Sequence, residues 1–307
     1  MKFSVSIVIP CFNEKDNIRV IYQQLTDVLN IYPEYELIFV DDGSTDSTLE
    51  IIKSVSVSDT RVRYLSLSRN FGHQHALKAG LDHATGNCII SLDADLQHPP
   101  SLIPLLMEKW KEGFDVVNTI RSEQKSLSTY KKLSSKLFYS IVNKFSSVEI
   151  IPGAADYRLL DRKVVEALKQ FDENYIFLRG LIPWMGFKQT SIRFEPAERH
   201  TGKTKYSFIR MLRLALDGIT SFSIRPLYLS IAVGSIIAGI AFIYGIYAVY
   251  VHLFTDNALP GWTSITASVL FIGGIQLIML GIIGIYLGKL FIENKKRPNY
   301  IIHHKNF

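Results

Sequence analysis

Two long stretches without charged side chains lie in the C-terminal third of the chain, and they limit the possible folds more than any other feature. No Asp, Glu, Lys or Arg occurs in residues 226–255 or in residues 257–288. Each stretch exceeds the roughly 20 apolar residues that cross about 30 Å of hydrocarbon. The sequence therefore predicts two transmembrane helices, at about residues 227–253 and 264–290. The alternative is a buried helical hairpin of a soluble domain, although such helices seldom run this far without a charge.

Basic residues flank the two stretches on their outer sides only. The connecting residues 254–263 contain no Lys or Arg. The flanking basic residues are Arg210, Arg213 and Arg225 before the first stretch, and Lys289, Lys295, Lys296 and Arg297 after the second. Because basic loops stay in the cytoplasm, both termini are predicted to be cytoplasmic. The N-terminus enters a strand-like pattern at once and shows no cleavable signal, so the first two hundred residues are expected in the cytosol.

The remaining composition agrees with a cytosolic part that works beside a lipid bilayer. Cys11 and Cys88 are the only cysteines and stand in apolar, strand-like segments, which favours buried thiols over a disulfide or a metal pair. The net charge of +6 is modest. Its basic residues gather near the apolar stretches, a pattern that favours anionic headgroups and phosphates over nucleic acid as partners.

Residues 1–120 alternate short β-branched runs with helical patterns, which predicts an α/β domain with a mostly parallel sheet and helices on both faces. Strands are expected at residues 5–9, 37–40, 62–67, 88–92 and 116–118, with helices after the first and from Pro99-Pro100 onward. The sequence divides into five regions: residues 1–120, an α/β half of nucleotide-binding type; 121–205, a half of mixed pattern; 206–225, an amphipathic helix; 226–292, the hairpin; and 293–307, a basic cytoplasmic tail.

The segment at residues 206–224 carries its few charges on one narrow stripe and large apolar side chains elsewhere. This pattern predicts a helix lying in the membrane interface, with a core helix of the soluble part as the alternative. In the hairpin, Gly284 and Gly288, like Ser235 and Gly239, share one helix face. Small residues so spaced permit close helix contact, within the hairpin or between subunits of a homo-oligomer such as a dimer or tetramer.

Two carboxylates follow the strand expected at residues 88–92. Asp93 and Asp95 are two residues apart, so their side chains can point to one side while Ala94 faces inward. Oxygen ligands of this kind suit Mg²⁺ or Mn²⁺, which would bridge to a diphosphate and neutralise the charge on a departing nucleotide. A surface turn is the ordinary setting for such a pair, but this one ends an apolar strand, where ligands bind in α/β sheets.

A second acidic segment, Asp41-Asp42-Gly43-Ser44, follows the strand expected at residues 37–40. A carboxylate there is placed to hold base or ribose donors, and Asp46 or Ser47 is expected to cap the next helix. No Gly-x-Gly-x-x-Gly follows the first strand, which argues against a nicotinamide oxidoreductase.

Several motifs resemble, in order, the family 2 glycosyltransferases of GT-A fold. They are Ile9-Pro10-Cys11-Phe12-Asn13-Glu14, Val40-Asp41-Asp42-Gly43-Ser44, Ser68-Arg69-Asn70-Phe71-Gly72, Leu77-Lys78-Ala79-Gly80 and Asp93-Ala94-Asp95-Leu96-Gln97-His98-Pro99-Pro100. Within that family the chain is similar to polyprenyl-phosphate glycosyltransferases, near the bactoprenol glucosyltransferases and the dolichol-phosphate mannose synthases. The likeness continues through residues 156–162 and 199–206 into the apolar pair.

The resemblance implies a set of site residues and a place in the cell. Nucleoside contacts would come from Pro10, Asn13, Glu14 and Asp42, and a diphosphate contact from Lys78. Asp93, Asp95 and Gln97 would hold the metal and donor phosphates, and Asp156 would face the sugar. Lipid phosphate would be received by Arg121, Lys131, Arg199, Lys203 and Lys205, where the family often has Arg in place of Lys131. The place is the inner membrane of a bacterium.

The resemblance also implies a reaction: inverting transfer of a hexose, glucose from UDP-glucose first, to polyprenyl phosphate, for modification of the cell envelope. N-acetylglucosamine, galactose, mannose and aminoarabinose stay open as sugars. A processive polysaccharide synthase would carry a Gln-x-x-Arg-Trp motif and more membrane spans, and the sequence shows neither. An inactive nucleotide-sugar-binding protein would not need both Asp93 and Asp95, and a transporter would need charges inside the membrane.

Overall fold

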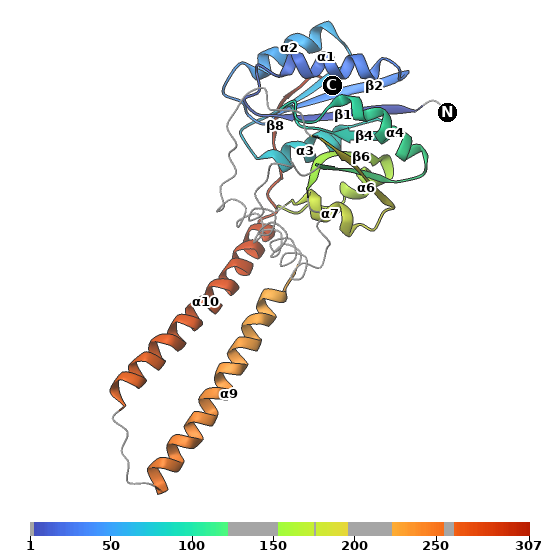
Figure 1. Cartoon of the computed structure of the whole chain (residues 1–307). Coiled ribbons are helices and arrows are strands. Elements are labelled where there is room, and N and C mark those ends of the chain that lie inside the picture. The colour runs from blue at the N-terminus through green and yellow to red at the C-terminus, as the bar shows by residue number, and fades with distance from the viewer. Residues whose placement is uncertain (1–2, 122–152, 175, 196–222, 255–260) are drawn as a thin grey trace.

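A computed structural model describes residues 3–121, 153–174, 176–195, 223–254 and 261–307. It contains one eight-stranded sheet with the order β7-β5-β6-β4-β1-β2-β3-β8. Strands β1 to β4 run parallel, whereas β6 is antiparallel to both of its neighbours and β8 is antiparallel to β3. Figure 1 shows this sheet with helices on both faces and two long helices extending away from it. The mostly parallel α/β fold predicted from the sequence is confirmed.

The elements follow in chain order as β1 Ser4–Cys11, α1 Ile18–Leu29, β2 Glu34–Asp41, α2 Thr48–Ser58, β3 Val62–Leu67, α3 His73–His83, β4 Cys88–Ser91, η1 Pro100–Leu102, α4 Ile103–Lys111, β5 Val116–Arg121, β6 Ala154–Asp161, α6 Arg162–Leu168, α7 Leu178–Trp184, β7 Gln189–Phe194, α9 Arg225–Phe254, α10 Trp262–Asn294 and β8 Ile302–Lys305.

Each face of the sheet is covered by its own set of helices, because alternate side chains of a strand point to opposite faces. Ile7 of β1 packs in one core with side chains of α1, α2 and α4, whereas Val8 packs in the other with α3, α6 and α7. Ile18, Ile21 and Leu25 of α1 are fully buried, as their helical spacing predicts. Both cysteines are free and buried, as expected.

Three strands were not foreseen in the sequence: β6, β7 and β8. β7, like β6, lies in the residues 121–200 for which the sequence predicts no strand. β6 crosses the residues whose secondary structure the sequence left open, and β8 forms within residues 293–307, which the sequence indicates only as a basic tail. The strand β8 pairs with the edge strand β3, so the chain returns to the catalytic sheet after α10. In Figure 1 the C-terminus accordingly lies against the sheet.

The helices α9 and α10 are long and apolar enough to cross a membrane. Their most apolar windows, Arg225–Tyr247 and Phe271–Asn294, contain no side chain buried within the chain, which does not fit a soluble core hairpin. A Cβ added at Gly239, Gly284 or Gly288 would meet no atom within 4 Å. These glycine positions are therefore not packed against the neighbouring helix of the same chain, and contact between subunits stays a prediction.

Several sequence-based expectations fall outside the described residues. They are most of the interfacial helix predicted at residues 206–224 and the phosphate-binding candidates Lys131, Arg199, Lys203 and Lys205. The proposed domain boundaries likewise stay predictions.

Candidate active site

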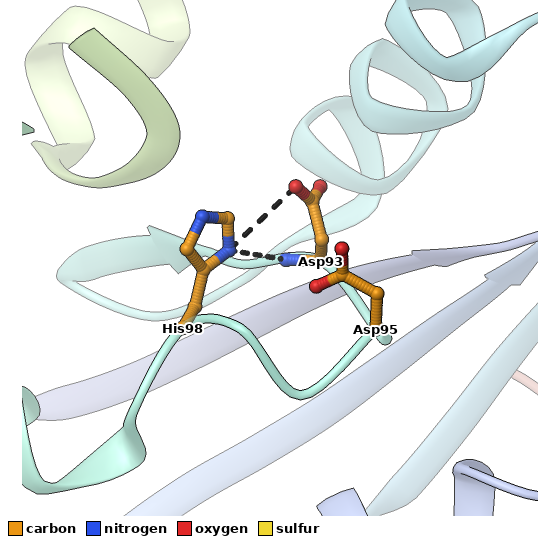
Figure 2. Close-up of side chains that lie close together, drawn as sticks. All are labelled: Asp93, Asp95 and His98. Atoms are coloured by element: carbon orange, nitrogen blue, oxygen red, sulfur yellow. Dashed lines mark hydrogen bonds and ion pairs between the residues drawn. The ribbon is translucent and has the colours of Figure 1, made fainter. Parts of the chain in front are cut away.

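The carboxylates of Asp93 and Asp95 lie just beyond the carboxyl end of β4, near the centre of the sheet. Together with His98 they offer three ligand atoms within 4.8 Å of one another. Figure 2 shows the three side chains close together, with the imidazole of His98 facing Asp93. Ala94 between them is 2% exposed and belongs to the core, as the alternation of an extended segment predicts. Burial raises the pKa of Asp93, and the facing His73 opposes that rise.

A tight turn fixes the second carboxylate. Leu96 adopts a left-handed backbone conformation with φ of 61°, which is unfavourable for a residue with a side chain. Its side chain is 8% exposed and packs in the core, which anchors the turn. The amide of Gln97 then donates to Oδ1 of Asp95 at 3.1 Å. Strain held in place by burial is common at functional sites.

His98 orients the first carboxylate. The ring is fully buried; its Nδ1 lies 3.2 Å from the amide of Asp93 and 3.6 Å from Oδ2 of the same residue, and its Nε2 lies 3.0 Å from Nη2 of Arg121. Burial and the guanidinium of Arg121 lower the pKa of His98 to about 3, so the ring is neutral. Because both nitrogens already have partners, we assign His98 to orientation and leave the carboxylates as the metal ligands.

The site fits a hard divalent cation. Oδ1 of Asp93 is buried and has no hydrogen-bond partner among the described residues, although it lies 3.4 Å from Nε2 of His73. A buried carboxylate oxygen without a donor is costly, and a cation would compensate it. Two carboxylates with room for further oxygen ligands suit Mg²⁺ or Mn²⁺. The acidic pair predicted from the sequence is therefore present with suitable chemistry, and the identity of the metal stays a proposal.

Asp156 lies on β6 opposite this pair and is surrounded by donors. Its Oδ1 accepts from Nη2 of Arg158 at 3.0 Å and Nε of Arg179 at 3.1 Å. Its Oδ2 accepts from Nη2 of Arg179 at 2.9 Å and Nε2 of Gln74 at 3.3 Å. Burial alone would raise the pKa of Asp156, but Arg179, His73 and Arg158 reverse this and hold it well below its usual range. Asp156 is therefore ionised and pairs with several cationic side chains.

His73, the first residue of α3, bridges the two acidic groups. Its Nε2 lies 3.4 Å from Oδ1 of Asp93 and 3.5 Å from Oδ2 of Asp156. Burial lowers the pKa of His73, yet the hydrogen bond and charge of Asp156 and the charge of Asp93 outweigh it and raise the pKa to about 8. In the metal-free site this imidazolium balances two carboxylates.

The acidic segment after β2 organises a neighbouring loop. Asp42 is 3% exposed, and its carboxylate accepts from the amides of Phe71 at 2.7 Å and Gly72 at 3.0 Å. Gly43 has φ of 68°, and a Cβ there would lie 2.5 Å from the carbonyl carbon of Arg69. Only glycine permits this approach, so the loop at residues 68–72 is held close to the end of β2 and leads directly to His73.

The segment after β1 is joined to the segment after β2. Asn13 has φ of 56° and accepts through Oδ1 from the amide of Thr45 at 2.8 Å, while its own amide donates to Oγ of Ser44 at 3.0 Å. The amide of Glu14 donates to Oγ1 of Thr48 at 2.9 Å. With Pro10 in β1, these residues line the carboxyl ends of adjacent parallel strands, where the sequence predicts nucleoside contacts. The expected helix cap is Asp46, whose carboxylate accepts from the amide of Thr48.

Lys78 has a different partner from the one that the resemblance implies. The side chain is 5% exposed, and its Nζ pairs with Oδ1 of Asp82 at 2.5 Å, one turn further along α3. That turn lies beyond Lys78, on the side away from His73. Without a ligand, Lys78 is thus ion-paired within the helix, and its expected diphosphate contact stays a prediction.

The resemblance also missed several residues of this site. His73 and Gln74 directly follow the motif at residues 68–72, His98 and Arg158 stand inside quoted motifs, and Arg179 has no motif around it. Each contacts Asp93 or Asp156. A search of the sequence for polar side chains that can donate hydrogen bonds, within or beside the motifs, could have found the first four.

Comparison with known proteins places this geometry in a family. A family model described as Glycosyl transferase family 2 matches residues 6–169, which include every strand from β1 to β6. The chain belongs to glycosyltransferase family 2. It is 44% identical over 298 residues to an uncharacterized glycosyltransferase of Bacillus subtilis (strain 168), YkcC, covering 97% of this chain and 92% of that protein.

Relatives with more specific names are nearly as similar. The prophage bactoprenol glucosyl transferase homolog of Escherichia coli (strain K12) is 43% identical, covering 97% of this chain and 98% of that protein. The bactoprenol glucosyl transferase of Shigella phage SfV is 41% identical, covering 97% of each. These alignments extend over the apolar helices as well as the sheet domain.

Proposed function

We propose that this enzyme transfers a hexose, glucose in the first instance, from a UDP-sugar to polyprenyl phosphate with inversion at the sugar carbon. The names of two relatives that match over nearly the whole chain support a polyprenyl acceptor and glucose as the sugar. The two apolar helices support an acceptor that resides in a membrane. The product, a polyprenyl-phosphate sugar, would serve modification of cell-envelope glycans.

The observation that carries the proposal is the buried Oδ1 of Asp93 beside Asp95, at the end of a central strand. This oxygen accepts no hydrogen bond from the described residues, and its contact there is the charge of His73 at 3.4 Å. Asp93 and Asp95 would hold Mg²⁺ or Mn²⁺, which when bound neutralises charge on the leaving diphosphate. Gln97 would assist with donor phosphates. Pro10, Asn13, Glu14 and Asp42 would line the nucleoside, with Asp42 acting largely through the loop at residues 68–72.

A phosphate acceptor removes the need for a general base. Its oxygen carries between one and two negative charges near neutral pH, by analogy with the second pKa of about 6 of a phosphorylated side chain. Asp156, whose pKa is held low and whose oxygens all have cationic or amide donors, is poorly suited to accept a proton. We assign it to positioning: it holds His73, Arg158 and Arg179 in one place.

The main task is then to bring two anions together. Arg121, which reaches His98 at the edge of the site, would begin a cationic path for the lipid phosphate. Lys131, Arg199, Lys203 and Lys205 would continue it. The active site would thus lie on the cytoplasmic face of the membrane, close to the headgroups, with the donor arriving from the cytosol.

One assay tests the proposal. Purified protein is incubated with a panel of nucleotide-sugars, a short polyprenyl phosphate and Mg²⁺ or Mn²⁺, and the lipid products are identified by mass. We expect one glycosylated polyprenyl phosphate, formed from UDP-glucose. A product from another donor would correct the sugar, a polysaccharide would indicate a processive synthase, and nucleotide-sugar binding without any product would indicate an inactive relative.

The stereochemistry is tested separately, by NMR of the anomeric proton in the product. The donor carries an α-linked sugar, so inversion predicts a β-linked product. An α-linked product would contradict the single-displacement mechanism.

A further inference from the structure

The segment that follows α10 is built into the catalytic part of the molecule. Strand β8 pairs with β3 in an antiparallel register that places Lys305 opposite Leu65 and Ile302 opposite Leu67. Asn306 adds two hydrogen bonds, accepting from the amide of Tyr64 at 2.7 Å and donating to the carbonyl of Val62 at 3.1 Å. The segment therefore spans the full length of β3.

One end of this pairing reaches the loop that leads into the active site. The amide of Ser68 donates to the carbonyl of Ile301 at 2.9 Å, directly after β3 ends. Ser68 begins the loop whose far end, Phe71 and Gly72, is held by Asp42. The loop is thus fixed on one side by the acidic segment after β2 and on the other by the segment after α10.

A partly buried polar triad, Tyr300, Asp82 and Lys78, ties the same segment to α3. The hydroxyl of Tyr300 donates to Oδ2 of Asp82 at 3.0 Å, and Oδ1 of Asp82 pairs with Lys78. The Tyr300 ring also packs edge-on against His83. Burial and the charge of Asp82 raise the pKa of Tyr300, so its hydroxyl stays protonated and donates. Because α3 begins at His73, the triad holds the helix that carries the bridge between Asp93 and Asp156.

A second connection joins α10 to the other side of the site. Glu293, in the last turn of α10, accepts from the amide of Asn174 at 2.9 Å and from its Nδ2 at 3.3 Å. Asn174 precedes α7, whose second residue is Arg179. The end of α10 and the residues after it thus contact α3 and the segment before α7. These two elements carry His73 and Arg179, which pair with Asp156.

We propose that the segment at residues 293–306 is a positioning element of the active site, with Tyr300 as its central positioning residue. It acts through Asp82 and Lys78 on α3 and through Ser68 on the following loop, and so holds His73 and the donor side at a fixed place relative to α10. The role in transfer rests on the proposed function, whereas the physical linkage does not.

The test uses the full-length protein with Tyr300→Phe, which removes the hydroxyl and keeps the ring on His83. Amide hydrogen exchange is followed by mass spectrometry in peptides covering residues 68–76, with peptides from β1 and α1 as internal references. The matched control is His303→Ala, an exposed neighbour in β8. We expect Tyr300→Phe to speed exchange at residues 68–76 by about threefold to tenfold, with the references and the control unchanged.

Transfer kinetics supply the second measurement. Tyr300→Phe should lower kcat on the order of threefold to tenfold while KM for polyprenyl phosphate stays within about twofold, because the donor side is displaced and the acceptor side is not. Asp82→Asn, which also removes the charge that pairs with Lys78, should show at least the same defect. The double variant should be no worse than Asp82→Asn alone, since the hydroxyl of Tyr300 acts through Asp82.

The outcomes separate the two proposals. Wild-type exchange at residues 68–76 in Tyr300→Phe, or a uniform rise across all peptides, would overturn the positioning role. A wild-type protein that binds no nucleotide-sugar and transfers no sugar would refute the proposed function, and the exchange comparison would still decide whether the segment controls the loop.

Discussion

The contacts of the Asp93 carboxylate with its neighbours leave part of its hydrogen-bonding capacity unused. One of its oxygens faces His98 at 3.6 Å. The other is buried 3.4 Å from His73 and accepts no hydrogen bond from the part of the chain that the structure describes. The surrounding residues supply positive charge through His73 and Arg121 but leave that oxygen unsatisfied. A carboxylate held in this way can bind a cation.

The metal assignment is tested by Asp93→Asn and Asp95→Asn. Each removes one negative charge from the pair, so we expect transfer to fall by at least about 10²-fold while the protein stays folded and membrane-bound. Activity is measured with saturating metal, and folding by thermal unfolding. Asp27→Asn, at an exposed carboxylate bonded to Gln23 on α1, is the control and should keep wild-type turnover. Wild-type turnover in either site variant would remove the metal from this pair.

The backbone approach at Gly43 is tested by Gly43→Ala against Gly113→Ala. Both glycines have positive φ, 68° and 91°, so both substitutions incur the left-handed penalty of about 1–2 kcal/mol. Only at Gly43 would the new Cβ meet backbone, since nothing lies within 4 Å at Gly113. We expect Gly43→Ala to cost about 1–3 kcal/mol more in the free energy of unfolding. Equal losses in denaturant unfolding would show that the contact between Gly43 and residues 69–70 is unimportant.

The neutral state of His98 predicts a pH dependence of stability in the metal-free protein. The unfolded side chain titrates near 6.5 and the folded one near 3, so the folded protein binds fewer protons between these values. Its stability should therefore be unaffected by His98 above pH 6.5 and fall as the pH drops below it, by about 2 kcal/mol at pH 5. Unfolding in EDTA, compared between wild type and His98→Asn, measures this contribution.

The variant should lose less stability than wild type between pH 7 and pH 5. His303→Gln, at an exposed position, should follow wild type. Parallel curves for wild type and His98→Asn would mean that the pKa of His98 is the same in the folded and the unfolded protein, which would contradict the lowered pKa.

At the scale of elements, the sequence predicts the strands that are apolar and misses those that are not. β1 to β4 appear as β-branched runs because both of their faces are buried. β6 carries Asp156 and Arg158 in buried positions, where paired charges replace the apolar residues that mark a strand. β8 is an edge strand with the sequence Ile302-His303-His304-Lys305, and an exposed edge needs no apolar alternation.

The same reasoning explains which site residues could be predicted. Asp93 and Asp95 directly follow a strand that the sequence predicts, so they can be identified as site residues from their position alone. Arg179 comes from a short helix far along the chain and meets Asp156 only because α7 packs on the second face of the sheet. Its role depends on tertiary packing, which no local pattern records.

The acceptor cluster is the element whose role rests on sequence alone. Arg199→Ala, Lys203→Ala and Lys205→Ala each remove a cation that would offset phosphate charge. We expect KM for polyprenyl phosphate to rise by about tenfold, from the loss of a charged hydrogen bond of about 1.5–3 kcal/mol, while nucleotide-sugar binding stays unchanged. Kinetics and donor titration measure the two effects, with Lys53→Ala on α2 as control. Equal effects on both substrates would move these residues to the donor site.

At the scale of the whole molecule, α9 and α10 begin and end at the same sheet domain. The chain passes from the sheet domain through two long apolar helices and returns to the same sheet through β8. If the helices span a bilayer, the segments before α9 and after α10 must lie on the same side as the catalytic sheet. This agrees with the charge distribution that predicts cytoplasmic termini.

Cysteine labelling tests this topology. A thiol introduced by Asn257→Cys should react with an impermeant reagent outside spheroplasts, and one introduced by Arg297→Cys only after lysis. Arg297 is exposed, whereas Asn306 is hydrogen-bonded to β3 and unsuitable. Wild type is the control, since Cys11 and Cys88 are buried and burial raises the pKa of both thiols. Labelling of the Arg297 variant from outside would place the catalytic domain on the wrong side.

The antiparallel strand β8 also has a consequence for biogenesis. β3 lies at the edge of the sheet until β8 is made, and β8 is synthesised after both long helices. During synthesis the β3 edge of the sheet therefore stays open, which exposes unpaired backbone groups that can pair with another chain. If α9 and α10 insert as a hairpin with both ends in the cytosol, the residues after α10 return to the side of the sheet, where they close that edge. Completion of the sheet is thereby coupled to correct insertion, and a chain inserted the wrong way would keep an aggregation-prone edge exposed to quality control.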